Sequence, residues 1–149
     1  MRLRFSGSEW EQLLRVPAVL FWAVAMADGR ADSGEERCFL DYVNRADHAD
    51  PLLAMVCDVL SSRGAEALQL SDRERDFRTY LGEMRGLLGR VLSPQESRSF
   101  LAGLLCLGHH VADASGGFFG LGNRISGAEA ARLVEVSSLL GLPALLDQD

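Results

Sequence analysis

The sequence contains no lysine: its 15 basic residues are all arginines. Catalysis through a lysine amine or a Schiff base is therefore excluded. Cysteine is scarce as well, and the three that occur, Cys38, Cys57 and Cys106, are widely spaced. An odd number at such spacing does not make a disulfide framework and is typical of a reducing cytoplasm.

Positive charge and long apolar runs are also lacking. Acidic residues number 21, the net charge is −6 and no basic stripe occurs, so nucleic acid is not an expected partner. The longest uncharged run near the start, Val16–Ala27, has 12 residues, fewer than the roughly 20 that a membrane-spanning helix needs. It indicates a buried helix. No apolar stretch of signal-peptide length follows the first residues, and we expect a cytoplasmic protein.

What the chain does contain is typical of one folded domain. Its 149 residues are 48% hydrophobic and 24% charged, the ordinary balance of a globular protein. A chain of this length can bury a sizeable core as a single unit. We therefore expect residues 1–149 to form one domain.

Helix start signals are frequent. Five capping side chains are each followed three residues later by Glu, and two prolines suit a first helical turn. No segment shows sustained strand alternation, and Gly64 and Gly141 suit helix ends, the last helix ending near Leu140. The sequence predicts an all-α protein, a compact bundle of about seven helices. The predicted starts are Ser8 with Glu11, Asp32 with Glu35, Ser71 with Glu74, Ser93 with Glu96, Ser126 with Glu129, and Pro17 and Pro51.

A unit of helix, acidic turn and helix occurs twice. Ala27-Asp28 follows one strongly apolar helix, and Ala112-Asp113 follows another, predicted over Phe100–Val111. After each turn, a capping residue and a Glu open an amphipathic helix. The second copy is longer because a glycine-rich loop, 115–124, is inserted. The repeat predicts two pseudo-symmetric units with Asp28 and Asp113 at corresponding places.

These two copies resemble the tellurite-resistance TerB-like family. The first is VAMADGRADSGEERCFLDYV, in which Asp28 and Glu35 are seven apart, and the second is HHVADASGGFFGLGNRISGAEAARLVEVSSLLGL. The second copy departs from the family pattern, since Ala114 follows Asp113 where the family usually has glycine. The resemblance spans about Pro17–Leu142 and is also to the N-terminal domain of a membrane-anchored DnaJ-like co-chaperone.

The resemblance implies a bundle of seven to eight helices with a pseudo-twofold arrangement and an acidic, cation-binding surface. It also implies a role in stress-related protein assemblies, often associated with a membrane. No catalytic residues are carried over, because the family has no established chemistry. On this basis we expect a protein-binding adaptor, cytoplasmic or peripheral at the inner face of the membrane, rather than an enzyme. The sequence does not indicate the oligomeric state.

The acidic turns raise the question of a cation site. Calcium and magnesium need several oxygen ligands brought together by a tight turn, which Gly29 permits. A weak calcium or magnesium site is one hypothesis. The other is purely structural: Asp32 caps a helix, Glu35 completes the capping box, and acidic groups favour a helix N-terminus. The candidate ligands are Asp28, Asp32, Glu35 and Glu36 in the first copy, and Asp113, Ser115, Asn123 and Glu129 in the second.

A different set of ligand-type residues lies just before Asp113. Cys106, His110 and Asp113 share one predicted helical face, and His109 precedes Asp113 by four positions. Thiolate, imidazole and carboxylate are ligands that a transition metal accepts, which makes a metal-dependent enzyme the alternative function. No paired Cys-x-x-Cys spacing supports a zinc site. The favoured interpretation is a small buried Cys, with His109 or His110 bonded to a carboxylate or the backbone.

The inserted loop GGFFGLGNR also has two interpretations. Phe118, Phe119 and Leu121 form either an exposed apolar tip for a partner or membrane surface, or a lid folded over the groove between the two copies. The lid is favoured, because burying two Phe side chains stabilises by several kcal/mol. The glycines match no phosphate-binding spacing.

Overall fold

The computed structural model describes residues 2–29, 33–45, 47–70, 76–116 and 127–142. These residues form six α-helices and three short 3-10 helices, with no strand among them. The predicted all-α fold, a compact bundle of about seven helices, is therefore confirmed. In chain order the elements are η1 (Arg2–Arg4), α1 (Gly7–Ala25), η2 (Met26–Asp28), α2 (Ser33–Val43), α3 (Pro51–Ser61), η3 (Gly64–Leu70), α4 (Phe77–Val91), α5 (Pro94–Gly116) and α6 (Gly127–Leu140).

Two of the predicted helix starts are formed as the sequence indicates. Asp50 accepts a hydrogen bond from the backbone N–H of Leu53 at 2.8 Å, with Pro51 in the first turn of α3. The Ser93 Oγ accepts from the Glu96 N–H at 3.1 Å, and the Glu96 carboxylate accepts from the Ser93 N–H at 2.9 Å. Both arrangements satisfy backbone donors that a helix leaves unpaired.

Other predicted starts are wrong. α1 is capped by Ser6 with Glu9, not by Ser8 with Glu11. No helix begins at Pro17, which lies inside α1, so two predicted helices are one. A proline in a helix costs a backbone hydrogen bond, but the residues around Pro17 are buried, and packing keeps the helix continuous. α4 is capped by Asp76. The start predicted at Ser71 with Glu74 lies outside the described residues.

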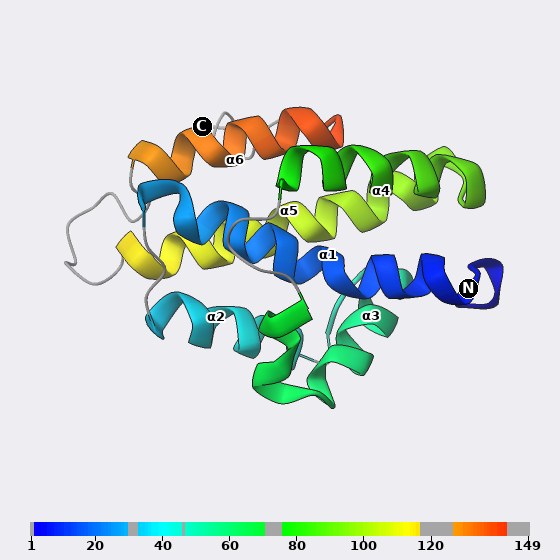
Figure 1. Ribbon diagram of the computed structural model, residues 1–149, viewed down its shortest axis with the longest axis horizontal. Helices are drawn as coiled ribbons and strands as arrows, with labels where there is room; N and C mark the ends of the chain where they lie inside the picture. The colour runs from blue at the N-terminus through cyan, green and yellow to red at the C-terminus, as the bar shows by residue number, and fades with distance from the viewer. Residues whose placement is uncertain (1, 30–32, 46, 71–75, 117–126, 143–149) are drawn as a thin grey trace.

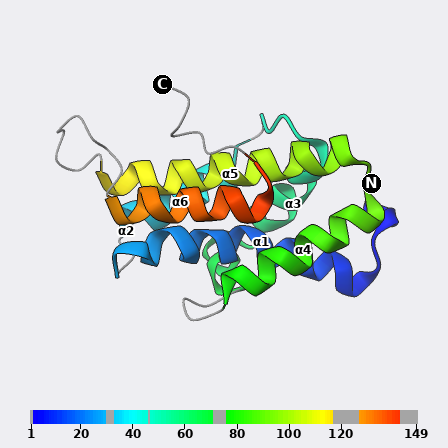
Figure 2. The same ribbon diagram turned by 90° about the horizontal axis from the view of Figure 1, so that it is seen from above.

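Helix α1 runs through the middle of the bundle. Figure 1 shows it with α4 and α6 on one side and α2, α3 and η3 on the other, and α1 also packs against α5. Figure 2 shows the same bundle from above, with α6 lying along α5. Leu13, Leu20, Phe21 and Val24 of α1 are fully buried. The uncharged run predicted as a buried helix is therefore buried.

Small residues in α5 let its neighbours approach closely. A Cβ added to Gly108 would lie 3.2 Å from Leu133 of α6 and 3.6 Å from Val24 of α1. A Cβ added to Gly103 would lie 2.5 Å from the Cδ2 of Leu53 in α3. Glycine at these two positions therefore sets the distance from α5 to three other helices.

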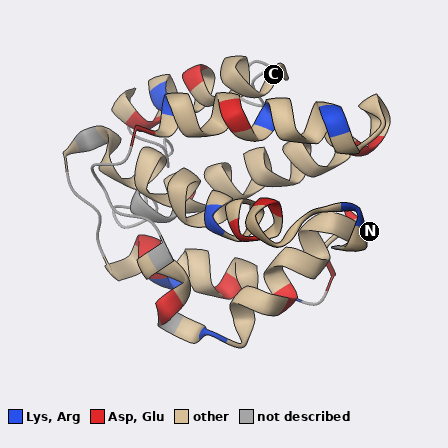
Figure 3. Cartoon of the chain, turned by 45° about the vertical axis from the view of Figure 1, so that its right-hand side comes forward, with Lys and Arg blue, Asp and Glu red and all other residues tan. Residues whose placement is uncertain are grey.

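Charged side chains are spread over the helices. Figure 3 shows arginine and acidic positions interspersed along the helices. Across the described ranges, no helix is both long and apolar enough to cross a bilayer.

Alanine substitutions at two helical glycines test the packing. Gly86 lies on the exposed face of α4, where an added Cβ meets nothing within 4 Å, so Gly86→Ala should raise the free energy of unfolding by about 1 kcal/mol. Gly103→Ala gains the same helix propensity but forces Leu53 to move, and should be less stable than Gly86→Ala by about 1–3 kcal/mol. Urea unfolding measures both. Equal stabilisation by the two variants would contradict the close packing of α5 on α3.

Candidate functional site

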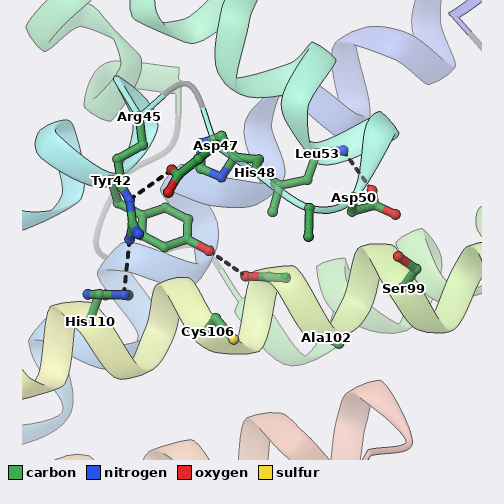
Figure 4. A pocket seen from close by; sticks show the side chains of 12 residues that line it. Tyr42, Arg45, Asp47, His48, Asp50, Leu53, Ser99, Ala102, Cys106 and His110 are labelled. Carbon is green, nitrogen blue, oxygen red and sulfur yellow. Dashed lines mark hydrogen bonds and ion pairs between the residues drawn. The ribbon is translucent and has the colours of Figure 1, made fainter.

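A groove of about 410 Å³ lies between the C-terminal end of α2, the start of α3 and one face of α5 (Figure 4). We call it the α2–α5 groove. Most of its polar side chains come from α2 and the connection to α3, whereas α5 supplies small residues, a thiol and an imidazole. The lining residues are Tyr42, Arg45, Asp47, His48, Ala49, Asp50, Leu53, Ser99, Ala102, Gly103, Cys106 and His110.

Tyr42 forms the centre of the groove. Its ring is mostly buried and lies between two imidazoles, with centroid distances of 5.0 Å to His48 and 4.9 Å to His110. Its hydroxyl donates a hydrogen bond to the backbone oxygen of Gly103 at 3.3 Å. Burial, and then the nearby Cys106 and Cys57 thiols, raises the pKa of Tyr42 to about 12. The phenol therefore stays protonated and ties α2 to α5.

Arg45 lies over the Tyr42 ring, with its Cζ 5.4 Å from the ring centroid. Its Nε donates to the Asp47 carboxylate at 3.2 Å, and its Nη1 is 3.4 Å from the Nε2 of His110. Figure 4 shows these two contacts on opposite sides of the guanidinium. Three neighbours thus fix the orientation of Arg45 in the groove.

The contact with Arg45 also determines the state of His110. A guanidinium can only donate, so the Nε2 of His110 accepts and the proton of the neutral ring is on Nδ1. Partial burial, and then the positive charge of Arg45, lowers the pKa of His110, while Asp113 acts in the opposite direction. His110 is therefore a neutral imidazole near pH 7. Its backbone oxygen accepts from the Cys38 thiol at 3.1 Å, a second link between α2 and α5.

The floor of the groove is provided by the start of α3. Asp50 is buried and its carboxylate accepts from the Leu53 N–H, so it caps α3. Leu53 is also buried and fills the space beside Gly103. The carboxylate of Asp50 is thus committed to the backbone of α3.

The set predicted as transition-metal ligands is divided by the structure. Cys106 and His110 line the α2–α5 groove, but His109 and Asp113 do not. Cys106 is exposed, so the prediction that it is buried is wrong. His109 is half-buried, and the pKa of its ring is lowered by that burial, while Asp113 raises it and His110 lowers it. In the described ranges no three His, Cys, Asp or Glu side chains gather in a way that could hold a metal ion.

The first acidic turn is only partly within the described residues. Gly29 has φ of 99°, the left-handed conformation that glycine favours, so the tight turn expected there is formed. Glu35 is the third residue of α2 and only 1% exposed, whereas Glu36 is half-buried. Consecutive residues of a helix point about 100° apart, so the side chains of Glu35 and Glu36 face different directions. Asp32 and the side chain of Asp28 lie outside the description.

The second acidic turn differs from the prediction. α5 continues to Gly116, so Asp113 lies within a helix and not in a turn. Ala112 and Ala114 favour helix on either side of it, which explains why the helix does not stop. Glu129 is the third residue of α6 and is fully buried. Ser115 (its side chain) and Asn123 lie outside the described residues, as do Phe118, Phe119 and Leu121 of the inserted loop.

The two buried glutamates occupy matching positions. Each is the third residue of its helix, Glu35 in α2 and Glu129 in α6, and a buried apolar residue follows four positions later, Phe39 and Leu133. The sequence indicated capping boxes at these places but not that the carboxylates would face the core. The register of the two glutamates matches the expected repeat, but Asp28 ends a 3-10 helix before the turn at Gly29, whereas Asp113 lies inside α5.

Sequence reasoning missed most of the α2–α5 groove. Tyr42, Arg45 and His48 follow one another at intervals of three, but α2 ends at Val43, so Arg45 and His48 lie beyond the helix and helical spacing does not place them together. The sequence therefore offered no local signal for the groove. Only Cys106 and His110 were selected, for a different role.

Comparisons with known proteins add no relative. No family model matches the chain, and no curated protein or solved structure matches it either. The resemblance to the TerB-like family therefore depends on the two sequence copies alone.

The lowered pKa values of His109 and His110 make stability depend on pH. Unfolding restores their ordinary value of about 6.5, so the unfolded state binds more protons between that pH and the lower folded-state values. The free energy of unfolding should fall as the pH falls from 7.5 to 5.5. Melting temperatures across this range test it, and a His109→Asn, His110→Asn double variant should have a flatter slope. Carboxylates with a lowered pKa, such as Glu96, change the free energy of unfolding only at more acidic pH. An identical slope in the double variant would contradict this account.

Proposed function

We propose that the chain is a TerB-like protein-binding module that holds a segment of a partner protein in the α2–α5 groove. The observation that carries this proposal is the oriented Tyr42, Arg45 and His110 cluster at a solvent-accessible groove. Tyrosine and arginine are enriched among the residues that dominate binding energy at protein interfaces. Side chains already fixed by their neighbours lose little freedom on binding.

The surface around Arg45 extends beyond the α2–α5 groove. A second hollow of about 440 Å³, lined from the end of α2 and from α3, also includes Arg45 and His48. Ser99, Ala102 and Cys106 are exposed along the α5 side of the groove. An extended peptide or a helix could lie across both hollows, which favours a protein segment as the occupant.

The alternative, a metal-dependent enzyme using Cys106, His109, His110 and Asp113, has less support. Only two of these four side chains line the groove. The Nε2 of His110 faces the positive charge of Arg45, which opposes a metal cation at the same place. We therefore favour binding over catalysis.

The wider role follows from the resemblance alone. TerB-like proteins take part in stress-related assemblies that are often membrane-associated. By extension, we propose a cytoplasmic partner, at the inner face of the membrane where the assembly is attached to it. Weak binding of calcium or magnesium at the first acidic turn is a subsidiary proposal, supported by the left-handed turn at Gly29 and the partly exposed Glu36. The second set of candidate ligands has no such turn, because Asp113 lies within α5.

Two matched positions test the binding surface. A photoreactive amino acid at Ala102, in the groove, should yield a discrete cross-linked protein in cells of the source organism, whereas the same amino acid at Ala131, exposed on α6, should not. With the captured protein purified, Ala102→Trp should weaken its binding at least about tenfold, because the indole fills the groove. Ala131→Trp serves as the control. Equal loss in both variants, or capture only from position 131, would rule out the groove as the binding surface.

The cation proposal is tested by melting curves. For a site with a dissociation constant of about 1 mM, 10 mM calcium or magnesium stabilises the native state by about 1.4 kcal/mol. This should raise the melting temperature by about 3–6 °C, and Asp28→Asn should remove the gain. Asp32→Ala should cost about 1 kcal/mol with or without metal, as the loss of a cap does. A wild-type curve that calcium, magnesium and manganese leave unchanged would make the acidic turns structural.

A further inference from the structure

We infer that a second surface, where α4, α5 and α6 meet, binds a protein segment in which a carboxylate stands next to an apolar side chain. A hollow of about 280 Å³ lies there, between the second half of α4, the start of α5 and the end of α6. We call it the Arg85–Arg98 pocket. None of the described residues lines both this pocket and the α2–α5 groove. The inference therefore goes beyond the proposed function and does not depend on it.

The charge of the pocket lining is positive. Arg85 of α4 and Arg98 of α5 both line it and are exposed, and no Asp or Glu is among its described lining residues. The carboxylates nearest to them in the sequence lie elsewhere. Glu96 pairs with Arg4 at 2.9 Å, and Glu83, two positions before Arg85, does not line the pocket. The two arginines thus complement an anionic group of a ligand.

The guanidinium groups also have donors to offer. Arg98 makes no hydrogen bond or ion pair within the described part of the chain. Arg85 uses its Nη1 for one bond, to the backbone oxygen of Leu139 at 3.2 Å. That bond holds the guanidinium over Gly141, where an added Cβ would lie 2.5 Å from Nη2. The remaining N–H groups suit a carboxylate, since a guanidinium can bind both of its oxygens at once.

The rest of the lining is largely apolar. Leu92, Leu101 and Leu140 line the pocket and are buried, so they form its floor, and the partly exposed Leu142 lies at its edge. An inorganic anion bound to the arginines would leave this floor in contact with water. An apolar side chain beside the carboxylate covers it and gains from that burial. The lining therefore favours a ligand that is acidic and apolar at adjacent positions.

The pocket is open to solvent, which favours a protein over a small molecule. Gly89 and Gly141 line it and are exposed, as are both arginines. A small carboxylic acid would remain largely in water here, whereas small-molecule sites usually cover most of their ligand. The net charge of −6 repels polyanions at long range, which disfavours nucleic acid and anionic membranes. A protein segment needs only one carboxylate, and its flanking residues can cover the rim.

Three matched peptides test the ligand class. Each has nine residues, with blocked ends and a central tripeptide between two Gly-Ser-Gly flanks: Leu-Glu-Leu, Leu-Gln-Leu or Ala-Glu-Ala. Each is titrated into the nitrogen-15-labelled full chain, and backbone NMR shifts give the affinity and the place of binding. The Leu-Glu-Leu peptide should bind at least about threefold more tightly than either of the others. Its shifts should centre on residues 85–92, 97–101 and 139–142.

A charge-neutralising variant with a matched control tests the arginines. Arg98→Gln removes a positive charge from a side chain that holds no described partner, and should weaken binding of the Leu-Glu-Leu peptide at least about fivefold. Binding of the Leu-Gln-Leu peptide should stay within about twofold. Arg37→Gln changes the net charge equally at an exposed position of α2 outside the pocket, and should leave both affinities within about twofold. Melting curves confirm that each variant is folded.

Several results would overturn the inference. These are equal affinity for the Leu-Glu-Leu and Leu-Gln-Leu peptides, equal weakening by Arg98→Gln and Arg37→Gln, and shifts confined to the α2–α5 groove. Binding to phosphatidylserine vesicles that requires Arg98, with no discrimination among the peptides, would assign the pocket to a membrane instead. Ala102→Trp, which fills the groove, should leave binding of the Leu-Glu-Leu peptide unchanged, so this inference and the proposed function can fail separately.

Discussion

The structure depends on burying α1 on every side. From Leu13 onwards this helix has only Arg15 exposed, and residues such as Leu20, Phe21 and Val24 are fully buried. A helix that is apolar on all faces cannot lie at the surface, so other helices must cover it in every direction. α3, α4, α5, α6 and η3 do so. The same constraint explains why Pro17 does not end the helix, because a break there would open the centre of the core.

The groove is a consequence of this arrangement. α2 and α5 both lie against the core, with Phe39 packed on Phe21 at a centroid distance of 5.2 Å. Tyr42, one turn after Phe39, then meets α5 at Gly103, where a side chain would collide with Leu53. The polar residues of the connection to α3 cannot follow into the core. They remain at its edge, where Arg45 is held between an aromatic ring, a carboxylate and a neutral imidazole.

Short-range patterns in the sequence predicted the features that depend on neighbouring residues. The caps at Asp50 and Ser93, the left-handed glycines at 64 and 141 and the helical class all follow from patterns within a few residues. The errors occur where distant packing decides: α1 continues through Pro17, α5 continues through Asp113, and Glu35 is buried rather than part of an exposed acidic surface. The groove could not be predicted, because its residues come from three elements and the Arg45 and His110 contact spans 65 positions of the chain.

The central proposal is that this domain binds a protein through the α2–α5 groove. Hydrogen–deuterium exchange of the domain, alone and in complex with its partner, tests this claim directly over the whole chain. The account predicts slower exchange on binding in residues 42–50 and 99–110, with little change in α4 and α6. Protection confined to α4 and α6, with the groove exchanging as it does in the free domain, would contradict the account.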